Sequence, residues 1–137
     1  MRPAEAFLSH ASADRQLASE LAEVLRRHGL PVWYSETDIR GAQQWHDEIG
    51  AALGRCDWFL LVLTPAAVES MWVKRELLFA LEERRYADRI ASIYVKECAY
   101  RRLSWVLSQY QLIDFRQDRE AGLRELFRIW GVGYRPA

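Results

Sequence analysis

The feature that most constrains the fold is an unbroken apolar run of six residues, Trp58 to Leu63. A strand that is apolar at every position has no face suited to water, which is typical of a central parallel strand covered by helices on both sides. The run is far shorter than the roughly twenty apolar residues that cross a bilayer. It therefore predicts the interior of an α/β sheet, and we expect no segment that spans a membrane.

Short apolar stretches and amphipathic segments alternate along the rest of the chain. Ser12 is expected to cap the first helix with its hydroxyl, and Gly29 to end that helix in the left-handed conformation. After the apolar run, Thr64-Pro65 is expected to cap and open the next helix, and Ser70 to restart it. Segment 101–109 is open between a short helix and a loop. The expected strands lie at 5–9, 32–34, 58–63, 90–95 and 112–115, and the helical faces lie within 17–28, 45–53, 72–85 and 123–130.

Strands that alternate with helices at this spacing predict right-handed βαβ crossovers. The expected fold class is α/β: a flavodoxin-like three-layer fold whose five-stranded parallel sheet has the order 2-1-3-4-5, with helices on both faces. In this order a ligand crevice lies at the carboxyl ends of the strands, near the switch between the first and the third. The segments expected there are Ser9-His10, Ser35 to Gln44, and the residues from Thr64 onward.

Length and composition indicate how many domains the chain forms and which classes of partner are expected. At 137 residues and 50% hydrophobic content, the chain is expected to form one domain over residues 1–137 with a core at about 4–130, either alone or as a module of a longer protein. Nineteen basic residues balance nineteen acidic ones, so we expect neither nucleic acid nor a membrane as a partner. Cys56 and Cys98 lack metal-ligand spacing, and the first residues lack a secretory core, so we expect no metal and a cytoplasmic location.

Three sequence blocks together resemble a bacterial-type TIR (Toll/interleukin-1 receptor) domain. The blocks are Ala6 to Ser12 (AFLSHAS), Val32 to Trp45 (VWYSETDIRGAQQW) and Ser70 to Leu77 (SMWVKREL). Each block alone is a weak signal. Their order and spacing, with the apolar strand between the second and the third, cover nearly the whole chain, and on this basis the chain is identified as a member of the family.

The second block is similar to the BB loop, through which family members associate with one another. The family usually has an acidic residue directly after the strand, where this chain has Ser35, and a Pro-Gly pair before the next helix, where it has Gly41 and Ala42. The resemblance implies self-association with other TIR domains. It assigns Ser35, Asp38, Gly41 and Ala42 to this assembly loop.

The third block implies an activity. In catalytic family members the glutamate of this motif is required to cleave NAD⁺, and Glu76 stands at that position, with Trp72 at the tryptophan of the motif. Trp72 and Glu76 are four residues apart and so share one helical face, which Phe79 and Ala80 are expected to continue. The resemblance thus implies that NAD⁺ is the substrate, that no cofactor is needed and that Glu76 is catalytic.

One carboxylate suits this chemistry. Cleavage of the nicotinamide bond expels a neutral leaving group and leaves positive charge on the ribose in an oxocarbenium-like transition state, which a carboxylate stabilises. Nicotinamide departs without a proton, so no second acid is required. Trp72 is expected to stack on a pyridinium or adenine ring.

Each candidate also has a structural interpretation. A lone glutamate on a helix is more often a solvated surface charge, and the family match is what favours a catalytic Glu76. Trp33, Trp58 and Trp130 are expected to be core aromatics, and for Trp72 a core aromatic and a stacking surface for a ligand are equally expected. Ser9 and His10 bind a phosphate or ribose at a helix start, or they form a simple capping loop. No acid is placed to orient His10, so a catalytic triad is not proposed.

Two further residues lie near the expected crevice. Arg40 either reaches a pyrophosphate or stays in solvent, and solvent is the commoner outcome for such a side chain. Trp45 either lines the mouth of the crevice or forms an assembly contact. Both are included among the candidate substrate-binding residues.

Other functions compete with NAD⁺ cleavage. Many TIR domains are adaptors that signal only by self-association, and the glutamate favours an enzyme without excluding both roles. A phospho-receiver domain needs acidic residues at the positions where this chain has Thr64 and Ser9-His10. A flavin site needs a phosphate loop rich in hydroxyl groups after the first strand, and Ser9 and Ser12 alone are too few. The resemblance implies antiphage defence, by NAD⁺ depletion or by a cyclic ADP-ribose messenger, and leaves the product open.

Overall fold

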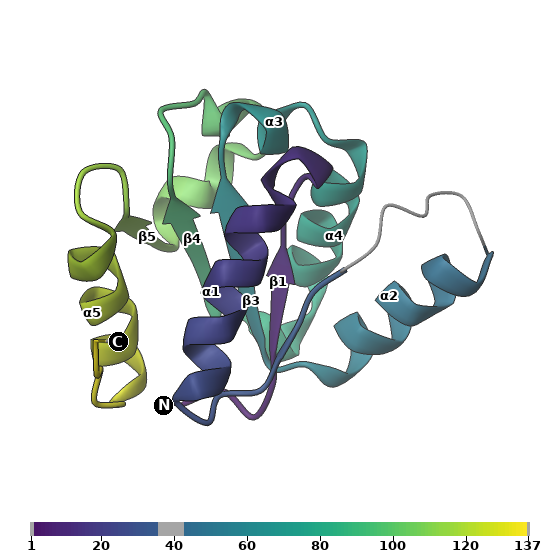
Figure 1. Cartoon of the computed structure of the whole chain (residues 1–137). Helices are drawn as coiled ribbons and strands as arrows, with labels where there is room; N and C mark the ends of the chain where they lie inside the picture. Colours follow the sequence, from purple (N-terminus) through teal and green to yellow (C-terminus); the bar gives the residue numbers. More distant parts are fainter. Residues whose placement is uncertain (1, 36–42, 137) are drawn as a thin grey trace.

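The structure is a computed structural model that describes residues 2–35 and 43–136, with residues 43–45 described by their backbone only. Within this part of the chain, five parallel strands form one sheet in the order β2-β1-β3-β4-β5, and helices cover both faces (Figure 1). This is the flavodoxin-like three-layer fold predicted from the alternation of strands and helices. None of the described helices is both long and apolar enough to span a membrane.

The sheet is centred on the apolar run that the sequence marks out. Every residue of β3 is buried, and β3 pairs with β1 on one side and β4 on the other. The strands are β1 (Ala6–Ser9), β2 (Val32–Trp33), β3 (Trp58–Leu63), β4 (Ile90–Tyr94) and β5 (Gln111–Asp114).

Two helices cover one face of the sheet and the remaining helices cover the other (Figure 1). The first face carries α1 (Arg15–Arg27) and α5 (Arg119–Trp130). The second carries α2 (Gln43–Arg55), α3 (Pro65–Val68), α4 (Met71–Glu82) and the 3₁₀ helices η2 (Arg84–Tyr86), η3 (Tyr100–Arg102) and η4 (Trp105–Gln109).

Side chains of β3 alternate between the two cores. Trp58, Leu60 and Val62 pack in the core beneath α1 and α5. Phe59, Leu61 and Leu63 pack in the core beneath α2, α3 and α4. A strand buried on both faces has no polar positions to offer, so the prediction of a central parallel strand is confirmed.

The entry to α1 differs from the prediction. The chain passes through the 3₁₀ turn η1 (Ser12–Asp14), and neither Ala11 nor Asp14, the residues that precede the two helical segments, makes a side-chain cap. The expected capping role of Ser12 is therefore wrong. The carboxylate of Asp14 instead accepts a hydrogen bond from the hydroxyl of Thr64 at 2.5 Å, fifty residues away in the sequence.

Thr64 has a second role, which the sequence predicted. Its Oγ1 accepts a hydrogen bond from the backbone N–H of Ala67 at 3.1 Å, so Thr64 caps α3. The same oxygen thus satisfies one of the unpaired N–H groups of α3 and binds Asp14. The segments that follow β1 and β3 are joined at this residue.

The end of α1 follows the prediction. Gly29 adopts a φ of 76°, in the left-handed region, and the N–H of Leu30 returns to the carbonyl of Leu25 at 3.0 Å. Such a bond satisfies a terminal helix carbonyl and turns the chain back towards the sheet. Segment 101–109, left open by the sequence, forms two short 3₁₀ helices.

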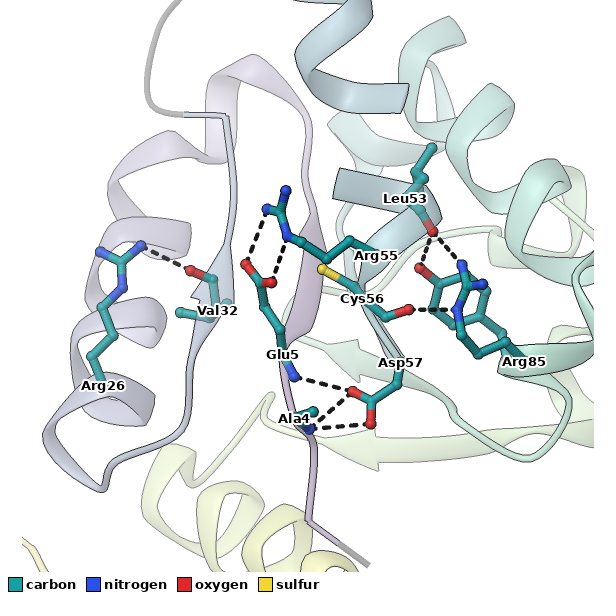
Figure 2. Close-up of polar contacts among 10 residues, drawn as sticks. Ala4, Glu5, Arg26, Val32, Leu53, Arg55, Cys56, Asp57 and Arg85 are labelled. Carbon is teal, nitrogen blue, oxygen red and sulfur yellow. Dashed lines mark hydrogen bonds and ion pairs between the residues drawn. The ribbon is translucent and has the colours of Figure 1, made fainter. Parts of the chain in front are cut away.

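The amino-terminal edge of the sheet is held by polar contacts around the end of α2 (Figure 2). Arg85 donates to the carbonyl of Cys56 at 2.7 Å and to that of Leu53 at 2.6 Å, and the Tyr86 hydroxyl donates to Leu53 at 2.6 Å. These donors satisfy carbonyls at a helix terminus that have no partner within the helix. The opposite, carboxyl-terminal edge of the sheet is the edge at which α/β folds bind ligands.

Candidate active site

A small cavity lies at the carboxyl end of β1, between the segment that follows β2 and the amino-terminal half of α4. Its lining comes from three parts of the chain that are far apart in sequence, as expected at the switch point of such a sheet. The lining residues are Phe7, Leu8, His10, Ser12, Trp33, Ser35, Ser70, Trp72 and Glu76.

Glu76 is a buried carboxylate. Only 8% of its surface is exposed, although it lines the cavity. The hydroxyl of Ser9, which is 1% exposed, donates a hydrogen bond to Oε1 of Glu76 across 2.6 Å. The interpretation of Glu76 as a solvated surface charge is therefore wrong, and so is the expectation that the residue lies exposed on its helix.

Ser9 differs in position from what the sequence suggested. It was a candidate for direct contact with a phosphate or ribose, but it is not among the residues that line the cavity. Its side chain is enclosed and contacts Glu76. Ser9 thus belongs to the support of the carboxylate.

Trp72 lies one helical turn before Glu76 and lines the same cavity, where it is partly buried. The guanidinium of Arg75 lies 5.4 Å from the centre of the Trp72 ring, and the ring of His46 on α2 lies 6.3 Å from it at an interplanar angle of 55°. A Trp face attracts cations, so the contact with Arg75 holds one positive charge against the Trp72 ring, although Arg75 itself does not line the cavity.

The local sequence explains how α4 presents these side chains. Ser70 precedes the helix, and its hydroxyl accepts a hydrogen bond from the N–H of Val73 at 3.2 Å, which confirms the predicted restart of the helix. Glu76 and Ala80 are both buried, whereas Phe79 is 40% exposed. The expected continuation of the stripe through Ala80 is confirmed and that through Phe79 is wrong, because the buried face of α4 consists of Val73, Glu76, Leu77 and Ala80.

His10 and Ser35 both line the cavity. The His10 ring lies 5.9 Å from that of the buried Tyr34, at an interplanar angle of 59°. With Trp72, the cavity thus includes two residues predicted to bind substrate, and Ser35 is one of the residues assigned to the assembly loop. Asp38, Arg40, Gly41 and Ala42 lie outside the described residues, as does the side chain of Trp45.

Trp33 is an aromatic residue of the lining that the sequence did not identify as part of the site. It was interpreted as a core aromatic, but it is only partly buried, and it stacks on Phe7 with ring centres 5.1 Å apart. The signal was available in the alternation of a strand, because Val32 points into the opposite core. Trp33 therefore adds a second aromatic wall to the cavity that Trp72 also lines.

The described part of the cavity is small. Its volume is about 40 Å³, which is room for one or two water molecules, whereas sites for drug-sized ligands span roughly 300–1,000 Å³. A dinucleotide therefore needs further walls beyond these residues. Across residues 2–35 and 43–136, no cluster of three or more His, Cys, Asp or Glu side chains is arranged to hold a metal ion.

Comparison with models of known protein families assigns the chain to a family. A TIR domain model matches residues 6–127. This chain belongs to the TIR domain family. The assignment agrees with the sequence resemblance, and it covers the three blocks that carry it together with β3 between them.

Curated bacterial relatives of this TIR domain have enzymatic names. Over 72 residues the chain is 32% identical to the 2' cyclic ADP-D-ribose synthase BtTIR of Bacteroides thetaiotaomicron, an overlap that covers 52% of this chain and 25% of that protein. Over 83 residues it is 32% identical to the NAD(+) hydrolase PdTIR of Paracoccus denitrificans, covering 58% and 28% respectively. The matched part spans about a quarter of the length of these relatives.

Solved structures share the fold at lower identity. The TIR domain of the Toll-related receptor TRR-2 from Hydra magnipapillata superposes with a TM-score of 0.73 at 19% identity, over 92% of this chain and 97% of that one. The TIR domains of the activated Roq1 resistosome give 0.70 at 14% identity, over 91% and 98%. These structural similarities establish the TIR fold only. The chemistry is inferred instead from Glu76 and the residues around it.

Proposed function

We propose that this TIR domain cleaves the bond between nicotinamide and ribose in NAD⁺, with the carboxylate of Glu76 as the catalytic group. The observation that carries the proposal is a buried carboxylate that opens into a cavity at the ligand-binding edge of the sheet. The names of the bacterial relatives, an NAD(+) hydrolase and a cyclic ADP-ribose synthase, support the same substrate.

The chemistry needs little more than charge in the right place. The C1'–N bond breaks, its electron pair leaves with neutral nicotinamide, and positive charge remains on the ribose. A carboxylate in a site with little water interacts with that charge more strongly than a solvated one does, because the effective dielectric constant is lower. Burial of Glu76 therefore favours the transition state over the ground state.

Aromatic rings at the cavity suit the leaving group. Trp72 and Trp33 line the same cavity as Glu76, and each presents an aromatic surface on which the cationic nicotinamide ring can stack. Cleavage of the C1'–N bond leaves nicotinamide neutral and so weakens the stacking, which favours release of nicotinamide from the site. The rings thus assist both binding of NAD⁺ and departure of nicotinamide.

We also propose that self-association completes the site. The described cavity is too small for a dinucleotide, so the site needs additional walls, and in this proposal a second copy of the domain supplies them. A heterologous contact between copies brings the assembly loop of one to the site of the next. The capture of the ribosyl cation by water or by a group of the same molecule then decides between ADP-ribose and a cyclic isomer.

The biological setting that we propose is cytoplasmic antiphage defence, in which cleavage depletes NAD⁺ or makes a cyclic ADP-ribose messenger. An adaptor role that rests on self-association alone is the competing function. Its support is the fold shared with TIR domains that are part of an activated resistosome. Turnover of NAD⁺ separates the two.

The test compares Glu76→Gln with a matched control, Glu82→Gln. Both glutamates lie on α4, but Glu82 is exposed and does not line the cavity. Glutamine is preferable to alanine at position 76 because its amide oxygen can still accept the hydrogen bond from Ser9, whereas alanine leaves that hydroxyl without its acceptor. Circular dichroism confirms that both variants fold.

The assay follows nicotinamide release from NAD⁺ by chromatography, with concentrated protein and with or without a crowding agent. We expect release by the wild type and by Glu82→Gln and none above background by Glu76→Gln. Equal release by all three proteins would contradict the role of Glu76. The absence of release from concentrated, crowded wild type would favour the adaptor.

A further inference from the structure

The hydrogen bond between Ser9 and Glu76 joins two elements that are remote in sequence. Ser9 is the last residue of β1 and Glu76 lies in the middle of α4, sixty-seven residues later. Both side chains are more than nine-tenths buried. The bond therefore exists only when α4 is packed against the sheet.

The geometry gives Glu76 and Ser9 different roles. Glu76 reaches the cavity, whereas Ser9 does not line it. A serine hydroxyl has a single proton to donate, and Ser9 donates it in the 2.6 Å hydrogen bond to Oε1 of Glu76. The carboxylate of Glu76, and not the Ser9 hydroxyl, is therefore the group that faces a ligand. The short distance is typical of an O–H group that donates to a charged oxygen.

We propose that Ser9 is a positioning residue that holds the Glu76 carboxylate ionised and in one orientation towards the cavity. The inference rests on the proposed NAD⁺ cleavage and names a second residue that the reaction needs. A donor to the charged form of a buried carboxyl stabilises that form, and a buried carboxyl without it takes up a proton more readily. A protonated Glu76 cannot stabilise positive charge on the ribose.

A purely structural role is the alternative, in which Ser9 only satisfies a buried polar group. The two roles separate in their dependence on pH. Among the described residues, His10 also lines the cavity and Arg75 lies against Trp72, but both are present in wild type and in Ser9→Ala, so a difference between the two profiles reports on Glu76. Loss of a structural bond lowers the amount of folded enzyme and hence the rate at every pH. Loss of a bond that keeps Glu76 ionised lowers the rate on the acid side and leaves the KM for NAD⁺ unchanged.

The chain supplies a matched control for the Ser9→Ala variant. Ser92 on β4 is completely buried in the same sheet, and among the described residues its hydroxyl has no hydrogen-bond partner. Ser92→Ala therefore removes the same atom from a similar environment without breaking a bond. Ser9→Cys, which is nearly isosteric and a weaker donor, should fall between wild type and Ser9→Ala.

The first measurement is the pH–rate profile of NAD⁺ cleavage. We expect the acid limb of Ser9→Ala to move to higher pH by about one to two units, because hydrogen bonds to charged groups contribute that much. At a fixed pH on this limb the rate should fall about 10- to 100-fold below wild type, and the two rates should converge at high pH. Ser92→Ala should follow the wild type throughout.

The second measurement does not need activity. The titration of the Glu76 carboxyl carbon is followed by NMR with ¹³C-labelled protein, assigned through its absence in Glu76→Gln. We expect the midpoint in Ser9→Ala to lie above that in wild type and the midpoint in Ser92→Ala to be unchanged.

The possible results separate the inference from the proposed function. Midpoints that coincide in wild type and Ser9→Ala would overturn the positioning role even if NAD⁺ is cleaved. A raised midpoint in a protein that never cleaves NAD⁺ would support the effect of Ser9 on the carboxylate and refute the proposed enzyme. Uniform loss of rate at all pH values, with an unchanged midpoint, would assign Ser9 a structural role.

Discussion

Replacement of Thr64 by valine tests how the segments around the candidate site are joined. Thr64 is 1% exposed and Asp14 is 8% exposed, so solvent screens their hydrogen bond very little. Thr64→Val is isosteric and removes two interactions at once: the donor to the Asp14 carboxylate and the acceptor for the N–H of Ala67. The packing of the side chain is retained.

The expected cost follows from these two bonds. A hydrogen bond to a carboxylate contributes about 1.5–3 kcal/mol. Loss of a helix cap adds about 1 kcal/mol, so Thr64→Val should lower the free energy of unfolding by roughly 2.5–4 kcal/mol. The control Thr64→Ser keeps both bonds and loses one methyl group, at about 0.8 kcal/mol.

Urea unfolding followed by tryptophan fluorescence measures the difference. With an m-value of about 2 kcal/mol/M, the midpoint of Thr64→Val should lie about 1–2 M below that of the wild type. Asp14→Asn, which keeps an acceptor, should lose less than Thr64→Val. The reasoning would be refuted if Thr64→Val and Thr64→Ser differed by less than about 0.5 kcal/mol, the usual scatter for surface substitutions.

Three further predictions concern the rest of the fold. Burial raises the pKa of Cys56 to about 12, so native protein should react with a thiol reagent only at Cys98 and unfolded protein at both; two fast thiols in native protein would contradict this. Gly122→Ala should destabilise the domain by about 1–3 kcal/mol in thermal unfolding, because a Cβ there would overlap the Phe115 ring, and an unchanged melting temperature would argue against this packing. Burial also raises the pKa of Tyr86 above 10.0, so the stability it contributes is complete below that pH and is lost as the pH rises towards the raised pKa; Tyr86→Phe should flatten this alkaline loss, and identical pH profiles would exclude the effect.

Local patterns in the sequence predicted those parts of the fold that local patterns determine. The apolar run of β3 predicted its burial on both faces, and Gly29 predicted the left-handed end of α1. Thr64 was predicted to begin a helix, because a cap depends on residues only three positions away. These features lie within one turn or one strand.

Pairings across the chain were not predictable in this way. Ser12 looked like a cap, but Asp14 contacts Thr64 fifty residues later, and no local spacing reports such a partner. The same holds for Ser9 and Glu76, sixty-seven residues apart. The sequence identified both as site residues, but only the three-dimensional structure shows that one supports the other.

The candidate site shows the same division. The family motif located Glu76 and Trp72, and the sheet order located the edge at which they lie. The burial of Glu76 could not be inferred from its sequence neighbours Lys74 and Arg75, which are exposed. Burial depends on how α4 packs against β1, and that packing turns an ordinary helix glutamate into a candidate catalytic group.

The most direct test of the central claim is the ratio of nicotinamide release from NAD⁺ by wild type to that by Glu76→Gln, measured on equal amounts of folded, concentrated protein. Loss of one preorganised electrostatic interaction typically lowers kcat by about 100- to 1,000-fold. We predict a ratio of at least that size, with Glu82→Gln equal to wild type. A ratio near one, with NAD⁺ still consumed, would show that Glu76 does not carry the reaction.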